Sequence, residues 1–289
     1  MKSHLTTPEP GNQTTIHSPP QNLWIYSFRG RFPPALTRHL PNYFGAWVEE
    51  DLSFLFFSAP AKDVALELAR EHPQVHWLDS YQMPYMDWIG GDLQPFSVGR
   101  VYVRPVWAEA CFEPPSGGVS LCLDPGVVFG GGTHQTTLDC LKALNFLASQ
   151  DQNQGRILDV GSGTGILSLA AAGLGWQEVV AVDLNPLAAW TTWDNVRRNG
   201  MQDRVLAVQG RAEGVLQIQA DTVVANIHHD VLAKILHTEA FRTTPRFILS
   251  GLLRSQAMSV LGELTELGAA IDGVLDDGTW FTLVGQQGR

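Results

Sequence analysis

Short apolar segments alternate with amphipathic segments over the first part of the chain. The segments LWIYSF, AWVEE, SFLFF and QVHWL have the length and composition of strands, and PPALTRHLPNYFG and PAKDVALELAREH have the spacing of apolar residues that is typical of helices. Pro33 and Pro34 are expected to open the first helix and Gly45 to end it. The order strand, helix, strand, strand, helix, strand predicts a ferredoxin-like βαββαβ module over residues 23–78.

This module does not combine a nucleophile with a general base, so we expect it to serve recognition or oligomerisation. The same topology is used for RNA binding, but the Lys/Arg-Gly-aromatic signature of that use is absent from the segment. Residues 1–22 are polar and rich in Thr, Pro and Gln, which predicts a disordered tail. Residues 79–120 are rich in Gly and Pro around the strand-like VGRVYVRPVW, which predicts a structured connector.

From residue 121 to residue 289, continuous apolar runs alternate with helical patterns. The segments GRILDVGSG, EVVAVD, RVLAVQG, DTVVANI and RFILSGLL are strand-like. Strands that are apolar on both faces indicate a mostly parallel sheet covered by helices, so this part predicts a Rossmann-like α/β domain. The segment AAIDGVLDDGTWFTLVGQ predicts two strands around a turn at Asp276, Asp277 and Gly278. We expect this hairpin to close the sheet with one antiparallel edge strand.

Three glycines lie where the strand RILDV is expected to turn into a helix. Gly161, Gly163 and Gly165 allow positive φ and a close approach of ligand to backbone. The N-terminus of the following helix favours an anion, either a phosphate or a carboxylate. A dinucleotide fingerprint has the spacing GxGxxG, whereas Gly161 and Gly165 are four residues apart. The tighter spacing resembles the first motif of class I methyltransferases and argues against NAD.

A carboxylate follows the next strand-like segment. Asp183 ends EVVAVD, 22 residues after Gly161, where it can accept hydrogen bonds from both hydroxyls of a ribose. Asn185 is expected to cap the next helix, Pro186 to occupy its first position and Gly200 to end it. The agreement of loop, spacing and caps favours nucleoside binding by Asp183 over the alternative of a simple turn residue.

Charge, cysteine content and hydropathy limit the binding partners and the cellular location that we expect. The 289-residue chain has a formal net charge of −10, which argues against direct nucleic-acid binding and suits a basic protein partner. Cys111, Cys122 and Cys140 form neither a CxxC pair nor a disulfide framework. No apolar run approaches the about 20 residues of a membrane-spanning helix, and the first residues lack the pattern of a secretory signal. We therefore expect a cytoplasmic protein without a membrane segment.

The segment LDPGVVFGGGTHQTT, residues 123–137, resembles the LDPGxxFGTGTHPTT segment of the bacterial methyltransferases that modify large-subunit ribosomal protein eleven. LDVGSGTGILSLAA, VDLNPLA, VVANI and LSGLLRSQA are similar to later motifs of that family in the same order, and DDGTWFTLV is similar to its closing strand. The likeness covers residues 121–284 and is weaker over the N-terminal module. Gln135 stands where the family usually has proline, and His228 and His229 stand where it commonly has small or apolar residues.

The resemblance implies an S-adenosylmethionine-dependent methyltransferase that modifies lysine side chains or the N-terminus of a large-subunit ribosomal protein, with the N-terminal module as a recognition domain. It implies contacts of Thr137, Gly161, Asp183 and Asn226 with the cofactor, Thr137 lying on a loop that can fold over the methionine end. Helix N-capping by Thr136 or Thr137 is the alternative. The expected cofactor-binding residues are Thr137, Gly161, Gly163, Gly165, Asp183 and Asn226.

Methyl transfer to an amine needs a neutral acceptor, whereas a lysine has an ordinary pKa of about 10.4. The site must therefore remove water and supply acceptors for the remaining N–H groups. Asn226 can supply its side-chain oxygen and Ile227 its main-chain carbonyl, so we predict that they position the acceptor. His228 is a candidate proton acceptor. The alternative places the histidine pair in a loop or helix start, with Asp230 as the cap.

A metal site is not expected. His134, His228, His229 and Asp230 have the side-chain types of metal ligands, but no HxxxH spacing supports their convergence. Two hypotheses remain beside the favoured one. The first is the same chemistry on another protein or a small amine, suggested by the divergent N-terminal module and the NIHH segment. The second is a non-catalytic module that binds S-adenosylmethionine without transferring its methyl group.

Overall fold

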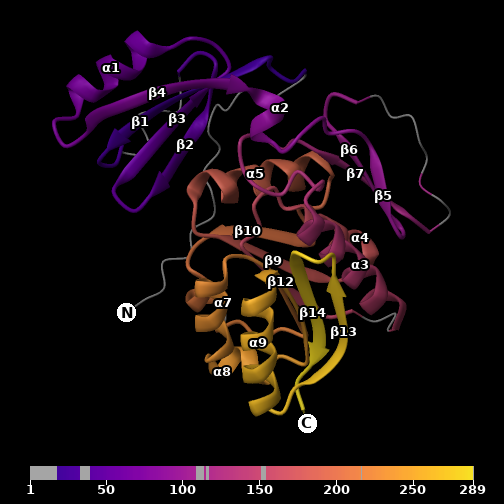
Figure 1. Ribbon diagram of the computed structural model, residues 1–289. Coiled ribbons are helices and arrows are strands. Elements are labelled where there is room, and N and C mark those ends of the chain that lie inside the picture. The colour runs from indigo at the N-terminus through magenta and orange to yellow at the C-terminus, as the bar shows by residue number, and fades with distance from the viewer. Residues whose placement is uncertain are drawn as a thin grey trace.

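The computed structural model describes residues 18–32, 40–108, 114, 117–150, 154–215 and 217–288. Within these residues the strands form three sheets that follow one another along the chain (Figure 1). The tail predicted for residues 1–22 lies mostly outside the described residues. None of the described helices is both long enough and apolar enough to cross a membrane.

The first sheet contains the strands predicted for the N-terminal module. They are β1 (Asn22–Arg29), β2 (Tyr43–Glu49), β3 (Leu52–Phe57) and β4 (His76–Pro84), and α1 (Lys62–Glu71) joins the last two. The strand order is β2-β3-β1-β4, and each neighbouring pair is antiparallel. The helix predicted to start at Pro33 falls largely on residues 33–39, which lie outside the described residues, so the complete βαββαβ unit stays a prediction.

The predicted role of Gly45 as a helix end is wrong. Gly45 lies inside β2, and its φ is +146°. The register of the pairing between β2 and β3 shifts between Tyr43 and Gly45. A Cβ at this position would lie 2.4 Å from Cδ1 of Leu187, which belongs to a helix of the last domain. The glycine therefore permits a close contact between two parts of the chain that the local sequence pattern does not report.

A small sheet follows in the segment predicted to be a structured connector. After the short helix α2 (Tyr85–Trp88), strands β5 (Phe96–Val98), β6 (Val101–Pro105) and β7 (Val119–Leu123) pair in that order. The predicted boundary between residues 78 and 79 falls inside β4, and the one between residues 120 and 121 falls inside β7.

The last sheet has the order β10-β9-β8-β11-β12-β14-β13. Its strands are β8 (Arg156–Val160), β9 (Glu178–Asp183), β10 (Val205–Gln209), β11 (Thr222–Asn226), β12 (Arg246–Leu253), β13 (Ala270–Asp276) and β14 (Trp280–Gln286). The helices are α3 (Gln135–Gln150), α4 (Ile166–Leu174), α5 (Pro186–Arg198), α6 (Ala212–Val215), α7 (His229–Leu236), α8 (Glu239–Thr243) and α9 (Arg254–Glu266). The predicted mostly parallel sheet is confirmed.

Helices cover both faces of this sheet, as the continuous apolar strands predict. On one face, buried side chains of α3 and α4 pack against the strands and against the small sheet. On the other face, α7, α8 and α9 form a second apolar core, and Figure 1 shows the two groups of helices on opposite sides. The sheet is therefore sandwiched, and the ends of its strands are the places where polar side chains can gather.

The hairpin was predicted correctly, but the predicted position of its antiparallel strand is wrong. The antiparallel strand is β14, which lies between β12 and β13, whereas the edge strand β13 has the same direction as the parallel strands. Burial explains the order. Phe281, Leu283 and Val284 of β14 are buried, whereas β13 is mostly exposed and includes Asp272 and Gly273. The apolar strand takes the interior position and the polar one the edge.

Candidate functional site

The glycine loop adopts the conformation that its sequence predicts. Gly161, Gly163 and Gly165 have φ of +78°, +55° and +83°, and Gly165 is the N-cap of α4. Neighbouring segments also exclude a side chain here. A Cβ on Gly161 would lie 2.1 Å from Cγ2 of Ile227, and a Cβ on Gly163 would lie 2.4 Å from the carbonyl oxygen of Phe129. Backbone conformation and close packing therefore both require glycine in this loop.

Asp183 lies at the end of β9 and is tied to the glycine loop. Its Oδ2 accepts a hydrogen bond from the amide of Gly163 at 3.0 Å, and its Oδ1 accepts one from the amide of Asn185 at 2.9 Å. Burial raises the pKa of Asp183, and the hydrogen bonds from Asn185, Gly163 and Leu184 oppose that rise. The predicted cap is confirmed: Asn185 accepts from the amide of Leu187 and Pro186 starts α5.

Thr137 and Asn226 come together at the end of β11. The side-chain amide of Asn226 donates to the hydroxyl of Thr137 at 3.5 Å, and Thr137 is fully buried. The prediction that Thr137 lies on the preceding loop is wrong, because it belongs to the first turn of α3. His134 precedes the helix and its ring Nδ1 lies 2.8 Å from the hydroxyl of Thr136. The helix therefore presents Thr137 as a fixed side chain.

The two oxygens predicted to position an acceptor face the same place. A Cβ built on Gly251, in β12, would lie 2.7 Å from the carbonyl oxygen of Ile227 and 3.3 Å from Oδ1 of Asn226. Gly251 has a φ of +83°, and a side chain at this position would crowd both oxygens. The structure thus brings the side-chain oxygen of Asn226 and the carbonyl oxygen of Ile227 close together beside the glycine loop.

His228 follows Ile227 directly, but its side chain is largely exposed. Its side chain is 72% exposed, and its Nδ1 accepts from the amide of Asp230 at 3.4 Å, which makes His228 the N-cap of α7. The alternative that places the histidine pair at a helix start is confirmed, but its cap is wrong, since Asp230 lies in the first turn of α7. His229 also lies near Asp230, with 3.6 Å between Nδ1 and Oδ1. In the part of the chain that the structure describes, no three His, Cys, Asp or Glu side chains form a group suited to a metal ion.

Asn195 of α5 and Asn199, the C-cap of that helix, hold the segment before the glycine-rich turn, and the sequence interpretation missed them. The side chain of Asn199 accepts from the amide of Cys122 and donates to its carbonyl, both at 2.8 Å. Asn195, one helical turn earlier, makes the same pair of contacts with Asp124 and also donates to the carbonyl of Thr164 at 2.9 Å. These amides pair with the backbone as a neighbouring strand would. A signal was present in the sequence, because two asparagines four residues apart share one face of a helix.

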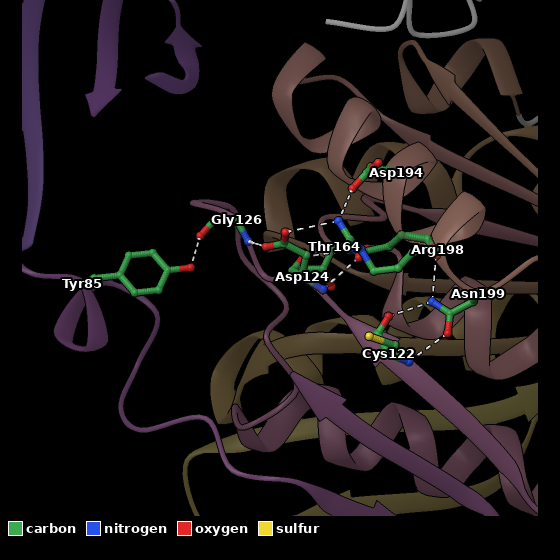
Figure 2. Close-up of polar contacts among 9 residues, drawn as sticks. Tyr85, Cys122, Asp124, Gly126, Thr164, Asp194, Arg198 and Asn199 are labelled. Atoms are coloured by element: carbon green, nitrogen blue, oxygen red, sulfur yellow. Dashed lines mark hydrogen bonds and ion pairs between the residues drawn. The ribbon is translucent and has the colours of Figure 1, made fainter. Parts of the chain in front are cut away.

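A chain of polar contacts continues from α5 to the N-terminal part of the protein (Figure 2). Arg198 lies 2.7 Å from Asp194 and 3.5 Å from Asp124, and Asp124 accepts from the amide of Gly126 at 3.0 Å. The carbonyl of Gly126 then accepts from the hydroxyl of Tyr85 at 2.6 Å. Burial and the nearby Asp124 raise the pKa of Tyr85, so its phenol stays a donor. The loop that follows Asp124 is therefore anchored on both sides.

Asp159, inside β8, is a buried carboxyl group behind the glycine loop. Its Oδ2 accepts from the hydroxyl of Ser168 at 2.6 Å. Burial raises the pKa of Asp159 to about 6, and the hydrogen bond from Ser168 opposes the rise. Asp159 therefore keeps its proton over a mildly acidic pH range in which an exposed aspartate is charged.

A cavity of about 1070 Å³ lies next to the glycine loop. One wall comes from the first sheet, with Trp47, Phe54 and Phe56, and another comes from Trp88. The remaining walls come from the loop of residues 127–131, the start of α3 and the turn before Trp280. Gly161, Asp183 and Asn226 are not among its lining residues, so this cavity adjoins the candidate cofactor site and is distinct from it.

The sheet order, the glycine loop after β8 and the carboxylate after β9 define an α/β methyltransferase fold of class I. The family model described as ribosomal protein L11 methyltransferase (PrmA) matches residues 51–288. The chain belongs to this family.

Individual relatives agree. The chain is 36% identical over 197 residues to a ribosomal protein L11 methyltransferase of Heliobacterium modesticaldum. The aligned region covers 67% of this chain and 61% of the relative. The chain is 37% identical over 198 residues to a ribosomal protein L11 methyltransferase of Chromohalobacter salexigens, covering 68% and 64%. The crystal structure of a ribosomal protein L11 methylase from Lactobacillus delbrueckii superposes with a TM-score of 0.56 at 25% identity, over 68% of this chain and all of that chain. The matched region thus spans a little under two thirds of the two sequence relatives.

Proposed function

We propose that this chain is an S-adenosylmethionine-dependent protein N-methyltransferase that acts on amines, either lysine side chains or the N-terminus, of a large-subunit ribosomal protein. Family membership supports the reaction class and the substrate class. The observation that carries the proposal is the meeting of Asn226 Oδ1 and the Ile227 carbonyl beside the glycine loop. This arrangement provides two acceptors for the N–H groups of an amine.

The residues around the glycine loop suit the cofactor. Gly161, Gly163 and Gly165 keep side chains away from the strand end, and the start of α4 offers free amides to a carboxylate. Asp183, held beside the amide of Gly163, is the proposed partner of the ribose hydroxyls. Thr137 is buried against Asn226 at the same end of the sheet. When bound, S-adenosylmethionine supplies a methyl group on a positively charged sulfur.

The role of the chain's own residues is to hold a neutral amine in line with that methyl group. Asn226 and the Ile227 carbonyl accept the two remaining N–H groups, which leaves the lone pair of the nitrogen free. Loss of water from the site favours the neutral amine, because burial disfavours a charged ammonium. His228 is exposed and caps α7, so we assign it no positioning contact with the acceptor. A role as proton acceptor through water stays a prediction.

The N-terminal part is proposed to recognise the substrate. We assign residues 23–78 to a ferredoxin-like βαββαβ module, residues 79–120 to the connector, residues 121–289 to the methyltransferase domain and residues 1–22 to a tail. The strand order β2-β3-β1-β4 supports the module, since it is the order of that topology. We therefore assign the enzyme to the cytoplasm and expect no direct contact with nucleic acid.

The proposal is tested by incubating the protein with methyl-labelled S-adenosylmethionine and purified ribosomal protein L11. We expect labelled L11, and mass spectrometry should locate the methyl groups on amines. Calorimetry should show binding of S-adenosylmethionine and of its demethylated product, but not of NAD. Binding without transfer to L11, to other ribosomal proteins or to small amines would support the non-catalytic hypothesis. Transfer to a different acceptor would keep the chemistry and change the substrate.

A further inference from the structure

The large cavity beside the cofactor site has charges of one sign. Glu49, at the end of β2, and Asp277, in the turn between β13 and β14, both line it. Neither Lys nor Arg occurs among its lining residues in the described part of the chain, and His134 is the one other titratable side chain there besides Tyr81. The two carboxylates come from parts of the sequence that are far apart, and only the fold places them on one cavity.

Asp277 is held in a defined position. Its Oδ1 accepts from the amide of Trp280 at 2.7 Å and from the amide of Thr279 at 2.9 Å. These hydrogen bonds, with a contribution from His134, lower the pKa of Asp277, so its carboxylate stays charged. Both amides donate to Oδ1 of Asp277. Among the contacts of the described residues, Oδ2 has no hydrogen-bond partner and can contact a ligand. A turn needs the acceptor at Oδ1, but it does not need the charge.

The remaining walls suit the stems of long basic side chains. Trp47, Phe54, Tyr81 and Trp88 line the cavity, and aromatic faces attract cations and pack against methylene chains. The volume of about 1070 Å³ reaches the upper limit of pockets for small molecules, which is about 1000 Å³. A segment of polypeptide therefore fits this cavity better than a single small amine does.

We propose that the cavity binds an extended basic segment of the protein substrate, and that Asp277 and Glu49 each contact a positively charged side chain flanking the acceptor amine. This inference rests on the proposed function and specifies its substrate: an amine with further cationic residues nearby. The net charge of −10 supports the assignment, because an acidic protein attracts a basic partner from solution. The carboxylates then act on substrate affinity and leave the chemical step unchanged.

The experiment compares Asp277→Asn and Glu49→Gln with the parent enzyme. Asparagine keeps an acceptor oxygen for the amides of Thr279 and Trp280, so the turn persists while the charge is lost. Asp276→Asn is the matched control, because Asp276 accepts from the amide of Gly278 in the same turn and does not line the cavity. The substrates are L11 and variants of L11 in which one lysine near the methylated amine is replaced by glutamine or by arginine.

With the parent enzyme, we expect replacement by glutamine to raise KM about two- to fivefold, the range of an exposed ion pair, and replacement by arginine to leave KM unchanged. Asp277→Asn or Glu49→Gln should raise KM for L11 by a similar factor with kcat unchanged. In at least one of these variants, KM should be the same for L11 and for the L11 variant in which lysine is replaced by glutamine. Asp276→Asn should behave as the parent does, and added salt should weaken the effect in the parent.

Three results would overturn the inference while leaving the proposed function intact. One is methylation of L11 with the same KM in all variants. Another is a fall in kcat without a change in KM. The third is a dimer, seen by sedimentation, that Glu49→Gln or Asp277→Asn dissociates, because the cavity would then hold a second copy of the chain. Failure of the proposed function is distinct: the parent would methylate no L11 substrate at all.

Discussion

The cofactor half and the substrate half of the candidate site are built from different kinds of contact. Around the glycine loop, main-chain groups determine the shape: Asp183 accepts from backbone amides, and the amide of Asn195 pairs with the backbone of Asp124. Around the large cavity, side chains determine it, with aromatic rings from the first sheet and carboxylates at Glu49 and Asp277. Backbone geometry tolerates few substitutions, whereas an exposed lining residue can change with little effect on the fold. The cofactor half should therefore be sensitive in folding and binding, and the substrate half in substrate affinity.

Asn226→Ala tests the point where the two halves meet, and it has the largest expected effect. Removal of Oδ1 leaves the acceptor amine poorly aligned, and a misplacement of about 1 Å costs on the order of a hundredfold in rate. The lost neutral hydrogen bond should weaken cofactor binding about tenfold or less. Single-turnover methylation and calorimetry measure the two quantities. If transfer proceeds at the parental rate with unchanged affinity, the assigned acceptor site is wrong.

Asp159→Asn tests how the buried carboxyl group behind the glycine loop affects the stability of the cofactor half. The folded pKa of Asp159 is about 6 and its ordinary value is 3.8, so the folded protein holds a proton that the unfolded chain releases. The resulting stabilisation is full below about pH 4 and is lost as the pH rises through about 6. Asparagine has no such dependence. The stability of the variant relative to the parent should therefore improve by about 2 to 3 kcal/mol between about pH 4 and pH 7.5, at about 1.4 kcal/mol per pKa unit.

Urea denaturation at the two pH values measures this difference. Ser168→Ala is a useful companion, since it removes the hydrogen bond to Oδ2 of Asp159 and should raise the pKa further. A difference between variant and parent that does not change with pH would show that Asp159 is not the group responsible.

Asp183→Ala tests the proposed ribose contact. Loss of hydrogen bonds to a charged acceptor costs about 1 to 3 kcal/mol of binding free energy, so the affinity for S-adenosylmethionine should fall about 5- to 150-fold. The loop amides of Gly163 and Asn185 also lose their acceptor, so circular dichroism must first show that the variant is folded. Unchanged affinity in a folded variant would place the ribose elsewhere. KM for L11 should change little, in contrast to the variants of Glu49 and Asp277.

Tyr85→Phe tests the link between the halves and has the smallest expected effect. The change removes the hydrogen bond of 2.6 Å to the Gly126 carbonyl, which lies on the loop that follows Asp124. A net loss of about 1 kcal/mol of stability is expected for one buried hydrogen bond. Thermal unfolding measures it, and KM and cofactor affinity show which half responds. A rise in KM alone would mean that the phenol orients the substrate half without affecting the cofactor half.

Local patterns in the sequence were sufficient to predict most elements of the last domain. The glycine loop, the cap at Asn185 with Pro186, and the alternation of apolar strands with helices all depend on neighbours in the chain, so their physics can be read from short segments. The candidate residues Asn226 and Ile227 could also be predicted from the sequence, because Asn226 ends β11 and Ile227 follows it, at the same sheet edge as Gly161. Their roles in binding and transfer remain predictions.

The sequence by itself determined which segments form strands and helices and which of them carry polar groups at their ends. Only the tertiary structure decided three further features. The position of β14 inside the sheet depends on which strand of a hairpin buries more apolar surface against the rest of the fold. Gly45 packs closely against Leu187, a residue far away in the sequence. The cavity joins Glu49 to Asp277 across separate sheets, because contacts between distant segments follow from packing, which no local pattern encodes.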